Sequence, residues 1–222
     1  MLFDIDGTLI RKAGPHHRQS LEDAVRHVTG VEASTAHIAT QGMLDGDILK
    51  RMMLDAGMRP RHISAALPAI MLAAGERYQQ LCPDLRQKVC PGVRGFLQKI
   101  RKRGVITGLV TGNLTRIGWL KMEKSGLRQH FEFGAFADQG NTRAALVRIA
   151  LGHARAAGWI TRKASVVLVG DHPNDVNAAK KNGVRSVAVT TGLSTKEELL
   201  AHGPDWAVDD LTQLNLEELL SK

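Results

Sequence analysis

The chain has 222 residues, of which 43% are hydrophobic, and its formal net charge at pH 7 is +8. This hydrophobic share is typical of globular domains and excludes a disordered chain, and the length fits one domain with a large insertion or two small domains. Two cysteines exclude a disulfide scaffold and favour a reducing compartment. The basic balance leaves two classes of function open, a nucleic-acid binder or an enzyme for anionic substrates.

The chain opens on a short apolar run at 2–3, which leads into the sequence Asp-Ile-Asp-Gly-Thr at 4–8. Two aspartates within six residues of the start are incompatible with the apolar region of a signal peptide. No apolar run approaches the roughly 20 residues of a membrane-spanning helix. We therefore expect a cytoplasmic protein with no membrane partner.

Residues 12–89 lack a strand pattern and are predicted to form helices at about 15–29, 45–56 and 60–80. A helical module of this size after the first strand is interpreted as an inserted cap domain. We expect it to act as a lid over the strand ends, with flexible points at Gly14 and Gly92.

Beyond residue 89, apolar runs alternate with helical patterns, as is typical of a parallel sheet covered on both faces. The predicted fold class is therefore α/β, with a Rossmann-like parallel-sheet core formed by residues 1–11 and 90–222 and an inserted α-helical cap formed by 12–89. The predicted strands of this part lie at 105–110, 166–169 and 186–189, and the predicted helices at about 93–103, 115–126, 142–157, 173–182 and 195–201.

Polar residues follow each predicted strand, and the carboxyl ends of parallel strands form the usual ligand site of such sheets. Asp4 and Asp6 lie two residues apart on an extended segment, so both carboxylates point to one side. Asp171 and Asp175 follow another strand. Four carboxylates at close range repel one another and need a cation, and oxygen ligands without His or Cys favour Mg²⁺.

Phosphoryl transfer at such a site needs a nucleophile, proton management and charge neutralisation. Asp4 would attack phosphorus and form an aspartyl-phosphate, while Asp6 would protonate the leaving oxygen and later deprotonate water. The Thr111 hydroxyl and the Gly112 amide would bind the non-bridging phosphate oxygens, and Arg143 would supply a fixed positive charge.

Three motifs occur in order: Phe-Asp-Ile-Asp-Gly-Thr-Leu at 3–9, Val-Thr-Gly-Asn at 110–113 and Val-Gly-Asp-His-Pro-Asn-Asp at 169–175. With them the chain resembles the haloacid dehalogenase-like hydrolase superfamily, in its phosphatase branch with a helical cap, similar to phosphoglycolate phosphatases. The resemblance implies three sets of site residues: those that hold Mg²⁺, those that act as nucleophile and acid/base, and those that bind the substrate. The metal residues are Asp4, Asp6 (through its backbone carbonyl), Asp171 and Asp175; the catalytic ones are Asp4 and Asp6; the substrate-binding ones are Thr111, Gly112, Asn113 and Arg143.

Two segments depart from the family pattern. Many relatives have Lys-Pro as the third motif, whereas this chain offers Arg143 at the start of a predicted helix. Gly-Met-Leu-Asp at 42–45 resembles the Gly-x-Thr-Asp cap loop of phosphatase and phosphomutase relatives, with leucine in place of threonine, and the cap is expected to select the substrate. His172 lies inside the last motif and is read equally well as lining the site or as a loop residue without a role.

The sequence therefore predicts a Mg²⁺-dependent phosphomonoester phosphatase for a small phosphorylated metabolite, working through an aspartyl-phosphate. Two alternatives stay open: a sugar phosphomutase of the same fold, and a non-catalytic protein that binds anions or nucleic acid. Because the excess basic charge is spread along the chain and the chain has nine aromatic residues, no nucleic-acid partner is expected. The oligomeric state is expected to be monomer or homodimer.

Overall fold

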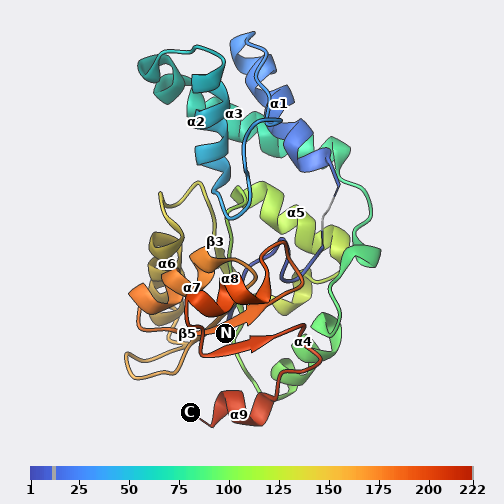
Figure 1. Ribbon diagram of the computed structural model, residues 1–222, viewed down its shortest axis with the longest axis vertical. Coiled ribbons are helices and arrows are strands. Elements are labelled where there is room, and N and C mark those ends of the chain that lie inside the picture. The colour runs from blue at the N-terminus through green and yellow to red at the C-terminus, as the bar shows by residue number, and fades with distance from the viewer. Residues whose placement is uncertain (12–13, 222) are drawn as a thin grey trace.

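A computed structural model of the protein describes residues 1–11 and 14–221. Six strands form one parallel sheet in the order β3-β2-β1-β4-β5-β6, drawn in the lower half of Figure 1. The order reverses around β1, which pairs with β2 on one side and β4 on the other, and ligands bind at such switch points. The strands are β1 (Leu2–Phe3), β2 (Gly108–Val110), β3 (Phe133–Ala135), β4 (Val167–Gly170), β5 (Arg185–Val189) and β6 (Trp206–Val208).

The sheet confirms the predicted α/β class and differs from the prediction in its edges. Both edge strands, β3 and β6, are absent from the sequence prediction. Each has three residues, β3 contains Gly134, and β6 is only half-buried, so neither carries the apolar run that marks a central strand. Strand β2 begins at Gly108, three residues later than predicted.

Helices follow the strands and cover the sheet. Five of them were predicted, and these match the prediction to within about two residues, whereas the last helix, Leu216–Leu220, was not predicted. Side-chain caps fix several of their starts: Thr142 accepts a hydrogen bond from the Ala145 amide at 3.1 Å and so begins α6 at Arg143. The helices are α4 (Val93–Lys102), α5 (Thr115–Ser125), α6 (Arg143–Ala156), α7 (Pro173–Lys181), α8 (Lys196–Ala201) and α9 (Leu216–Leu220), with 3₁₀ turns at Arg86–Lys88 and Arg128–His130.

Three further helices, inserted between β1 and β2, stand above the sheet in Figure 1: α1 (His16–Thr29), α2 (Asp45–Asp55) and α3 (Pro60–Leu81). They pack on one another, chiefly α1 on α3, and α3 also contacts α5 of the sheet layer. We call these helices and their connections the cap. The predicted start of the cap at residue 12 lies outside the described residues, and its division from the core at 89/90 stays a prediction.

Candidate active site

Three buried carboxylates meet at the carboxyl edge of the sheet. Asp4 directly follows β1, Asp171 directly follows β4, and Asp175 lies in the first turn of α7. Each offers an oxygen within 4.8 Å of the others. The Asp4 amide donates to the Val169 carbonyl at 2.9 Å, which ties the end of β1 to the neighbouring strand. The parallel sheet thus brings together residues that are up to 171 positions apart.

Asp171 is held in a niche that leaves no room for added side-chain atoms. The Thr8 hydroxyl donates to its Oδ1 at 2.9 Å. A Cβ on Gly7, whose φ is +84°, would lie 2.2 Å from Asp171 Oδ2, and a Cβ on Gly192 would lie 1.7 Å from it. The two glycines therefore allow the backbone to enclose this carboxylate.

The cluster is electrostatically strained without a cation. Burial raises the pKa of Asp171 well above its ordinary value, and repulsion from Asp4 and Asp175 raises it further. Burial also raises the pKa of Asp175 to about 7, although Arg143 opposes that rise. The folded protein therefore favours protons, or another cation, on these oxygens.

Arg143 supplies part of the missing positive charge. Its Nη1 donates to Asp4 Oδ1 at 2.9 Å and to the Val110 carbonyl at 3.3 Å, and its Nε lies 3.3 Å from Asp175 Oδ1. Burial lowers the pKa of Arg143, but Asp4 and Asp175 outweigh this effect and raise the pKa above its ordinary value. The residue expected to replace the family's third-motif lysine thus lies against the expected nucleophile.

The donor set of the cluster fits a hard divalent cation. All of its side-chain ligands are carboxylate oxygens, the type that Mg²⁺ prefers. Asp175 Oδ1 is buried and makes no hydrogen bond with any described residue; its partner is Arg143 Nε, at an ion-pair distance of 3.3 Å. Asp4, Asp171 and Asp175 are therefore the residues that could hold Mg²⁺.

Asp6 was expected both as a metal ligand, through its backbone carbonyl, and in catalysis. Its side-chain carboxylate lies outside the carboxylate cluster of Asp4, Asp171 and Asp175. Its Oδ1 and Oδ2 accept hydrogen bonds from Lys121 Nζ at 2.8 and 2.7 Å, and Oδ2 accepts another from Asn113 Nδ2 at 2.7 Å. Burial raises the pKa of Asp6, but Lys121 and His17 outweigh burial and leave it below its ordinary value. Any metal contact by Asp6 is thus left to its backbone carbonyl.

The segment Thr111–Asn113 lies directly after β2, beside Asp6. Thr111 Oγ1 accepts hydrogen bonds from Asn113 Nδ2 at 2.7 Å and from the Asn113 amide at 3.3 Å. The Asn113 side-chain oxygen accepts from Lys121 Nζ at 2.6 Å. Asn113 thus bonds to side chains of the site, and its expected contact with substrate stays a prediction. A Cβ on Gly112 would lie 3.5 Å from Arg143 Nη2, so this loop also adjoins the arginine.

Lys121 is a site residue that the sequence analysis missed. It lies on α5 with its side chain 1% exposed. A signal exists in the sequence, because Lys121 shares a helix face with residues that are all buried in the structure: Ile117, Gly118, Met122 and Ser125. A lysine at a core position of an amphipathic helix indicates a buried partner of opposite charge.

The cap reaches the site through two segments. His17 on α1 and Asp45 at the start of α2 join at 3.0 Å (Nε2 to Oδ2), and His17 Nδ1 lies 3.2 Å from Lys121 Nζ. Asp45 Oδ2 also accepts from the Leu114 amide of the core at 2.8 Å. The cap is thus docked on the core beside Asp6.

The cap loop at 42–45 touches two of the motifs. A Cβ on Gly42 would lie 2.4 Å from the His172 ring, and Asn174 Nδ2 donates to the Gly42 carbonyl at 3.0 Å. The Asp45 amide donates to the Gly112 carbonyl at 2.8 Å. His172, for which two readings were open, therefore packs against the cap loop, and its imidazole accepts a hydrogen bond from the Asn174 amide at 3.1 Å.

Residues 1–189 match the family model described as haloacid dehalogenase-like hydrolase. The chain belongs to the haloacid dehalogenase-like hydrolases. The match spans all three sequence motifs and every residue of the carboxylate cluster. This hydrolase is therefore an enzyme, and the non-catalytic alternative is set aside.

Curated relatives of this hydrolase include several phosphatases. It is 30% identical to a phosphoglycolate phosphatase of Agrobacterium fabrum, with 100% of this chain and 94% of that protein covered. It is 29% identical to a phosphoglycolate phosphatase of Synechococcus elongatus, over 72% of this chain and 70% of that protein. Family and relatives together support the expectation of a phosphoric monoester hydrolase.

Solved structures share the fold of this hydrolase. A β-phosphoglucomutase from Clostridium difficile superposes with a TM-score of 0.70 at 16% identity, covering 99% of this chain and 94% of that chain. A predicted phosphoglycolate phosphatase from Haemophilus somnus gives 0.67 at 20% identity, covering 98% and 95%. These similarities confirm the α/β fold.

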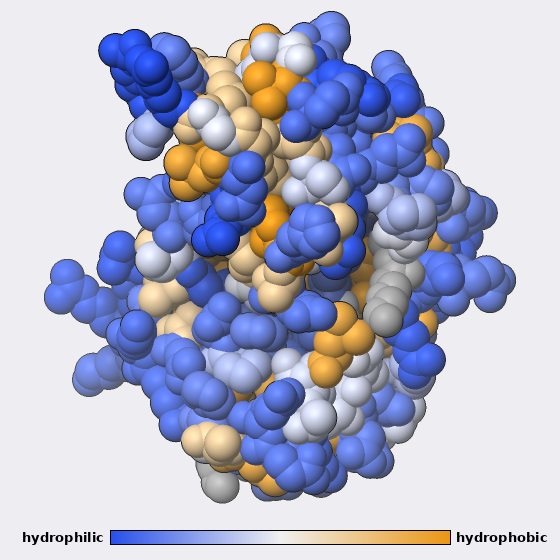
Figure 2. Space-filling model, turned by 45° about the horizontal axis from the view of Figure 1, so that its top comes forward, coloured by the Kyte–Doolittle hydropathy of each residue, from blue (hydrophilic) through white to orange (hydrophobic). Residues whose placement is uncertain are grey.

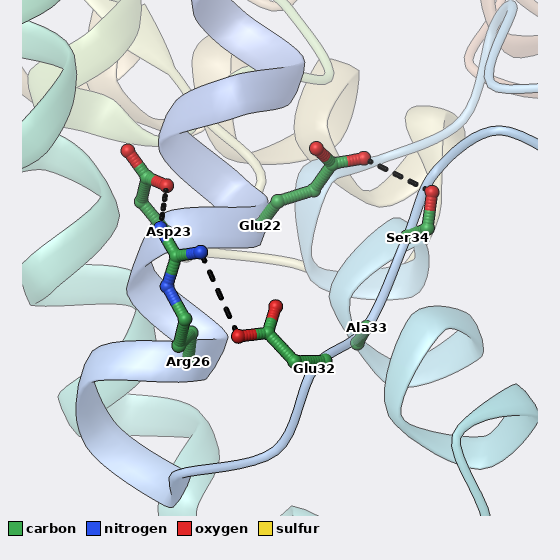
Figure 3. Close-up of a pocket in the computed structure, with 6 residues that line it drawn as sticks. All are labelled: Glu22, Asp23, Arg26, Glu32, Ala33 and Ser34. Atoms are coloured by element: carbon green, nitrogen blue, oxygen red, sulfur yellow. Dashed lines mark hydrogen bonds and ion pairs between the residues drawn. The ribbon is translucent and has the colours of Figure 1, made fainter.

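The face of this hydrolase seen in Figure 2 is largely hydrophilic, with apolar residues gathered mainly in its upper part, where the cap lies. A pocket of about 250 Å³ opens on the cap between α1 and the segment that follows it (Figure 3). Its charges are paired internally, because Arg26 lies 2.6 Å from Asp23 and 3.6 Å from Glu32. None of the predicted site residues lines this pocket.

Over the described chain, no helix is both long and apolar enough to span a membrane.

Proposed function

We propose that this hydrolase is a Mg²⁺-dependent phosphatase that removes the phosphoryl group from a small phosphorylated metabolite through an aspartyl-phosphate on Asp4. The observation that carries the proposal is the different setting of two aspartates that lie two residues apart. Asp4 is buried in the carboxylate cluster against Arg143, whereas Asp6 is held outside it and its side chain is 42% exposed. This difference supports Asp4 as the group that attacks phosphorus and Asp6 as the group that serves the leaving oxygen.

In the first step, a carboxylate oxygen of Asp4 forms a bond to phosphorus and the bond between phosphorus and the ester oxygen breaks. The electron pair of the broken bond goes to the leaving oxygen, and the proton from Asp6 neutralises it, so that an alcohol departs. Arg143 neutralises charge on the phosphoryl oxygens.

In the second step, Asp6 acts as a carboxylate base. It accepts a proton from water while the water oxygen attacks phosphorus, and the bond between phosphorus and Asp4 breaks to release phosphate. Asp4 and the protonated Asp6 are then restored. The lowered pKa of Asp6 favours the carboxylate form that this second step needs. For the first step Asp6 must take up a proton when the phosphate binds, because a nearby negative charge raises the pKa of a carboxyl group.

Mg²⁺ would be held by Asp4, Asp171 and Asp175, with the Asp6 backbone carbonyl as a further ligand. When bound, the cation supplies positive charge that offsets the repulsion between the carboxylates and the incoming phosphate. Thr111 and the Gly112 amide would bind the phosphoryl oxygens beside Arg143.

The substrate is proposed to be a small phosphomonoester. The Agrobacterium fabrum and Synechococcus elongatus relatives are phosphoglycolate phosphatases, and a relative from Thermus thermophilus is a phosphoserine phosphatase. Both names describe phosphorylated acids of a few carbon atoms, which suits a site over which the cap is docked. A cytoplasmic location and a monomeric or homodimeric state belong to the same proposal.

The test is a panel of phosphorylated metabolites and p-nitrophenyl phosphate, assayed with Mg²⁺ and with EDTA. We expect phosphate release that requires Mg²⁺, and its complete loss in Asp4→Asn. The matched control is Asp84→Asn, since Asp84 is an exposed aspartate paired with Arg86, and it should keep wild-type rates. Isomerised sugar phosphate without phosphate release would instead favour a mutase, and no turnover of any member would overturn the proposal.

A further inference from the structure

Burying a lysine ammonium is costly unless it is paired and hydrogen-bonded, so a buried lysine needs a reason. Lys121 meets these conditions through four contacts of Nζ: both oxygens of Asp6 at 2.8 and 2.7 Å, Asn113 Oδ1 at 2.6 Å and His17 Nδ1 at 3.2 Å. A solvent-exposed residue at this position would stabilise α5 equally well. The cost of burial is thus incurred at a position that touches the proposed acid/base.

The contacts of Lys121 fix the plane of the Asp6 carboxylate. A single ammonium that reaches both carboxylate oxygens restrains rotation about the last side-chain bond, and Asn113 Nδ2 holds one of these oxygens from a second direction at 2.7 Å. The Asp6 side chain is nevertheless 42% exposed, whereas that of Lys121 is 1% exposed. Lys121 therefore holds Asp6 from the protein side and leaves the other side free for substrate.

The position of Lys121 is itself set from the cap. His17 stands between Lys121 and Asp45, and the Tyr78 ring of α3 lies 5.9 Å from Lys121 Nζ and 5.8 Å from the His17 ring. These three cap residues come from α1, α2 and α3 in turn. The ammonium thus lies between core residues below and α1 and α3 of the cap above, and Asp45 of α2 holds His17 from behind.

We propose that Lys121 is a positioning residue that holds the Asp6 carboxylate in the orientation needed to transfer its proton to the leaving oxygen, and that His17 supports Lys121 from the cap. The inference rests on the proposed function, since it assigns a task within that reaction. It adds a residue from α5 that lies outside all three sequence motifs.

A positioning role has a signature that a merely structural role lacks. General acid catalysis matters most when the leaving oxygen is basic, so a misplaced Asp6 should slow phenyl phosphate more than p-nitrophenyl phosphate. Phenol resembles the tyrosine side chain, whose pKa is about 10, and a nitro group makes the leaving oxygen much less basic. Loss of folded protein would lower both rates by the same factor and leave their ratio unchanged.

The experiment measures kcat/KM of Lys121→Met for both aryl phosphates with saturating Mg²⁺. This parameter compares the first transition state with free enzyme and substrate, so later hydrolysis of the aspartyl-phosphate does not enter it. We expect the ratio of phenyl to p-nitrophenyl phosphate to fall about tenfold, a part of the roughly 10²–10⁴-fold effect of a general acid. Lys124→Met, an exposed lysine on the same helix, should leave the ratio unchanged.

His17→Asn serves as a second variant in case Lys121→Met does not fold, because the His17 side chain is 20% exposed and its two buried partners keep other hydrogen bonds. Lys121 keeps those to Asp6 and Asn113, and Asp45 keeps the one from the Leu114 amide. The ratio for His17→Asn should fall in the same direction by a smaller factor. An unchanged ratio in a folded Lys121→Met, or in His17→Asn if Lys121→Met is unfolded, would overturn the inference. Wild-type protein inactive on both substrates would overturn the proposed function instead, so the two failures are distinguishable.

Discussion

At the scale of single residues, the site depends on how differently the protein surrounds chemically identical side chains. Asp4 and Asp6 differ because a strand end carries one into the carboxylate cluster and a lysine holds the other away from it. Arg143 serves Asp4 and Asp175, whereas Lys121 serves Asp6. Each cation is thus paired with a different one of the two proposed catalytic aspartates.

Asp6→Asn tests the proposed acid/base role. An amide cannot deliver the proton or accept one from water, so kcat/KM for phenyl phosphate should fall by about 10²–10⁴-fold. Steady-state assays of purified protein check this, with Asp84→Asn as the control. A loss below about tenfold would assign proton transfer to another group.

Gly192→Ala tests the niche of Asp171. Because the new methyl group would lie 1.7 Å from Asp171 Oδ2, the carboxylate must move, and we expect Mg²⁺ affinity to fall about 10–100-fold. Gly152→Ala is the matched control, since nothing lies within 4 Å of its added Cβ on α6. Isothermal titration with Mg²⁺ gives the affinity of each variant. Equal affinities for the Gly192 and Gly152 variants would contradict the claim that Gly192 makes room for Asp171.

At the scale of elements, the loop after β2 has two partners. It lies beside Arg143 and Asp6 on one side, and the cap loop docks on it from the other, through the Asp45 amide and carboxylate. A Cβ on Gly112 would lie 2.4 Å from the Met43 carbonyl. The close approach of cap and core at this point therefore requires glycine at 112.

Gly112→Ala should therefore hold the cap away from the core. We expect faster proteolysis of the connections between cap and core, and a fall of about tenfold or more in kcat/KM because a misplaced cap no longer excludes water from the site. Gly95→Ala on α4, where an added Cβ meets nothing within 4 Å, is the control. Wild-type proteolysis in the Gly112 variant would contradict the docking argument.

Much of the element level was predictable from the sequence. The central strands and the helices follow from apolar runs and helical periodicity, and the motifs placed Asp4, Asp171 and Asp175 at strand ends that the sheet brings together. Local sequence patterns do not show which residues meet in the folded protein. The edge strands and the pairing of Lys121 with Asp6 were therefore not predicted. The sequence singled out Arg143 by its position at a helix start, but its contact with Asp4 depends on packing between α6 and the sheet.

At the scale of the whole molecule, the carboxylate cluster couples metal binding to stability. The raised pKa values of Asp171 and Asp175 mean that the metal-free folded protein binds protons that the unfolded chain has released above about pH 4. The contribution of Asp171 and Asp175 to stability is therefore fully present below about pH 4 and is lost as pH rises through their raised pKa values, that of Asp175 being about 7.

We expect Mg²⁺ to reverse this loss, because the proposed site would bind the cation through deprotonated carboxylates. The increase in Tm caused by Mg²⁺, relative to EDTA, should therefore be larger at pH 8 than at pH 5. Thermal unfolding at both pH values checks this, and the difference between the two conditions cancels groups elsewhere, such as the buried amino group of Met1, whose pKa is lowered to about 5. An Asp171→Asn variant should show a smaller increase at pH 8, and a wild-type increase that is equal at both pH values would contradict the assignment of the metal to this cluster.

The central claim is that Asp4 carries the phosphoryl group, and chemical trapping tests it most directly. Enzyme mixed with substrate and Mg²⁺ is quenched within a turnover and treated with borohydride, which reduces an acyl phosphate to the alcohol. Peptide mass spectrometry should then find residue 4 converted from aspartate to homoserine, with no conversion at Asp6 or in samples without substrate. Conversion at another residue, or none despite continuing phosphate release, would contradict the account.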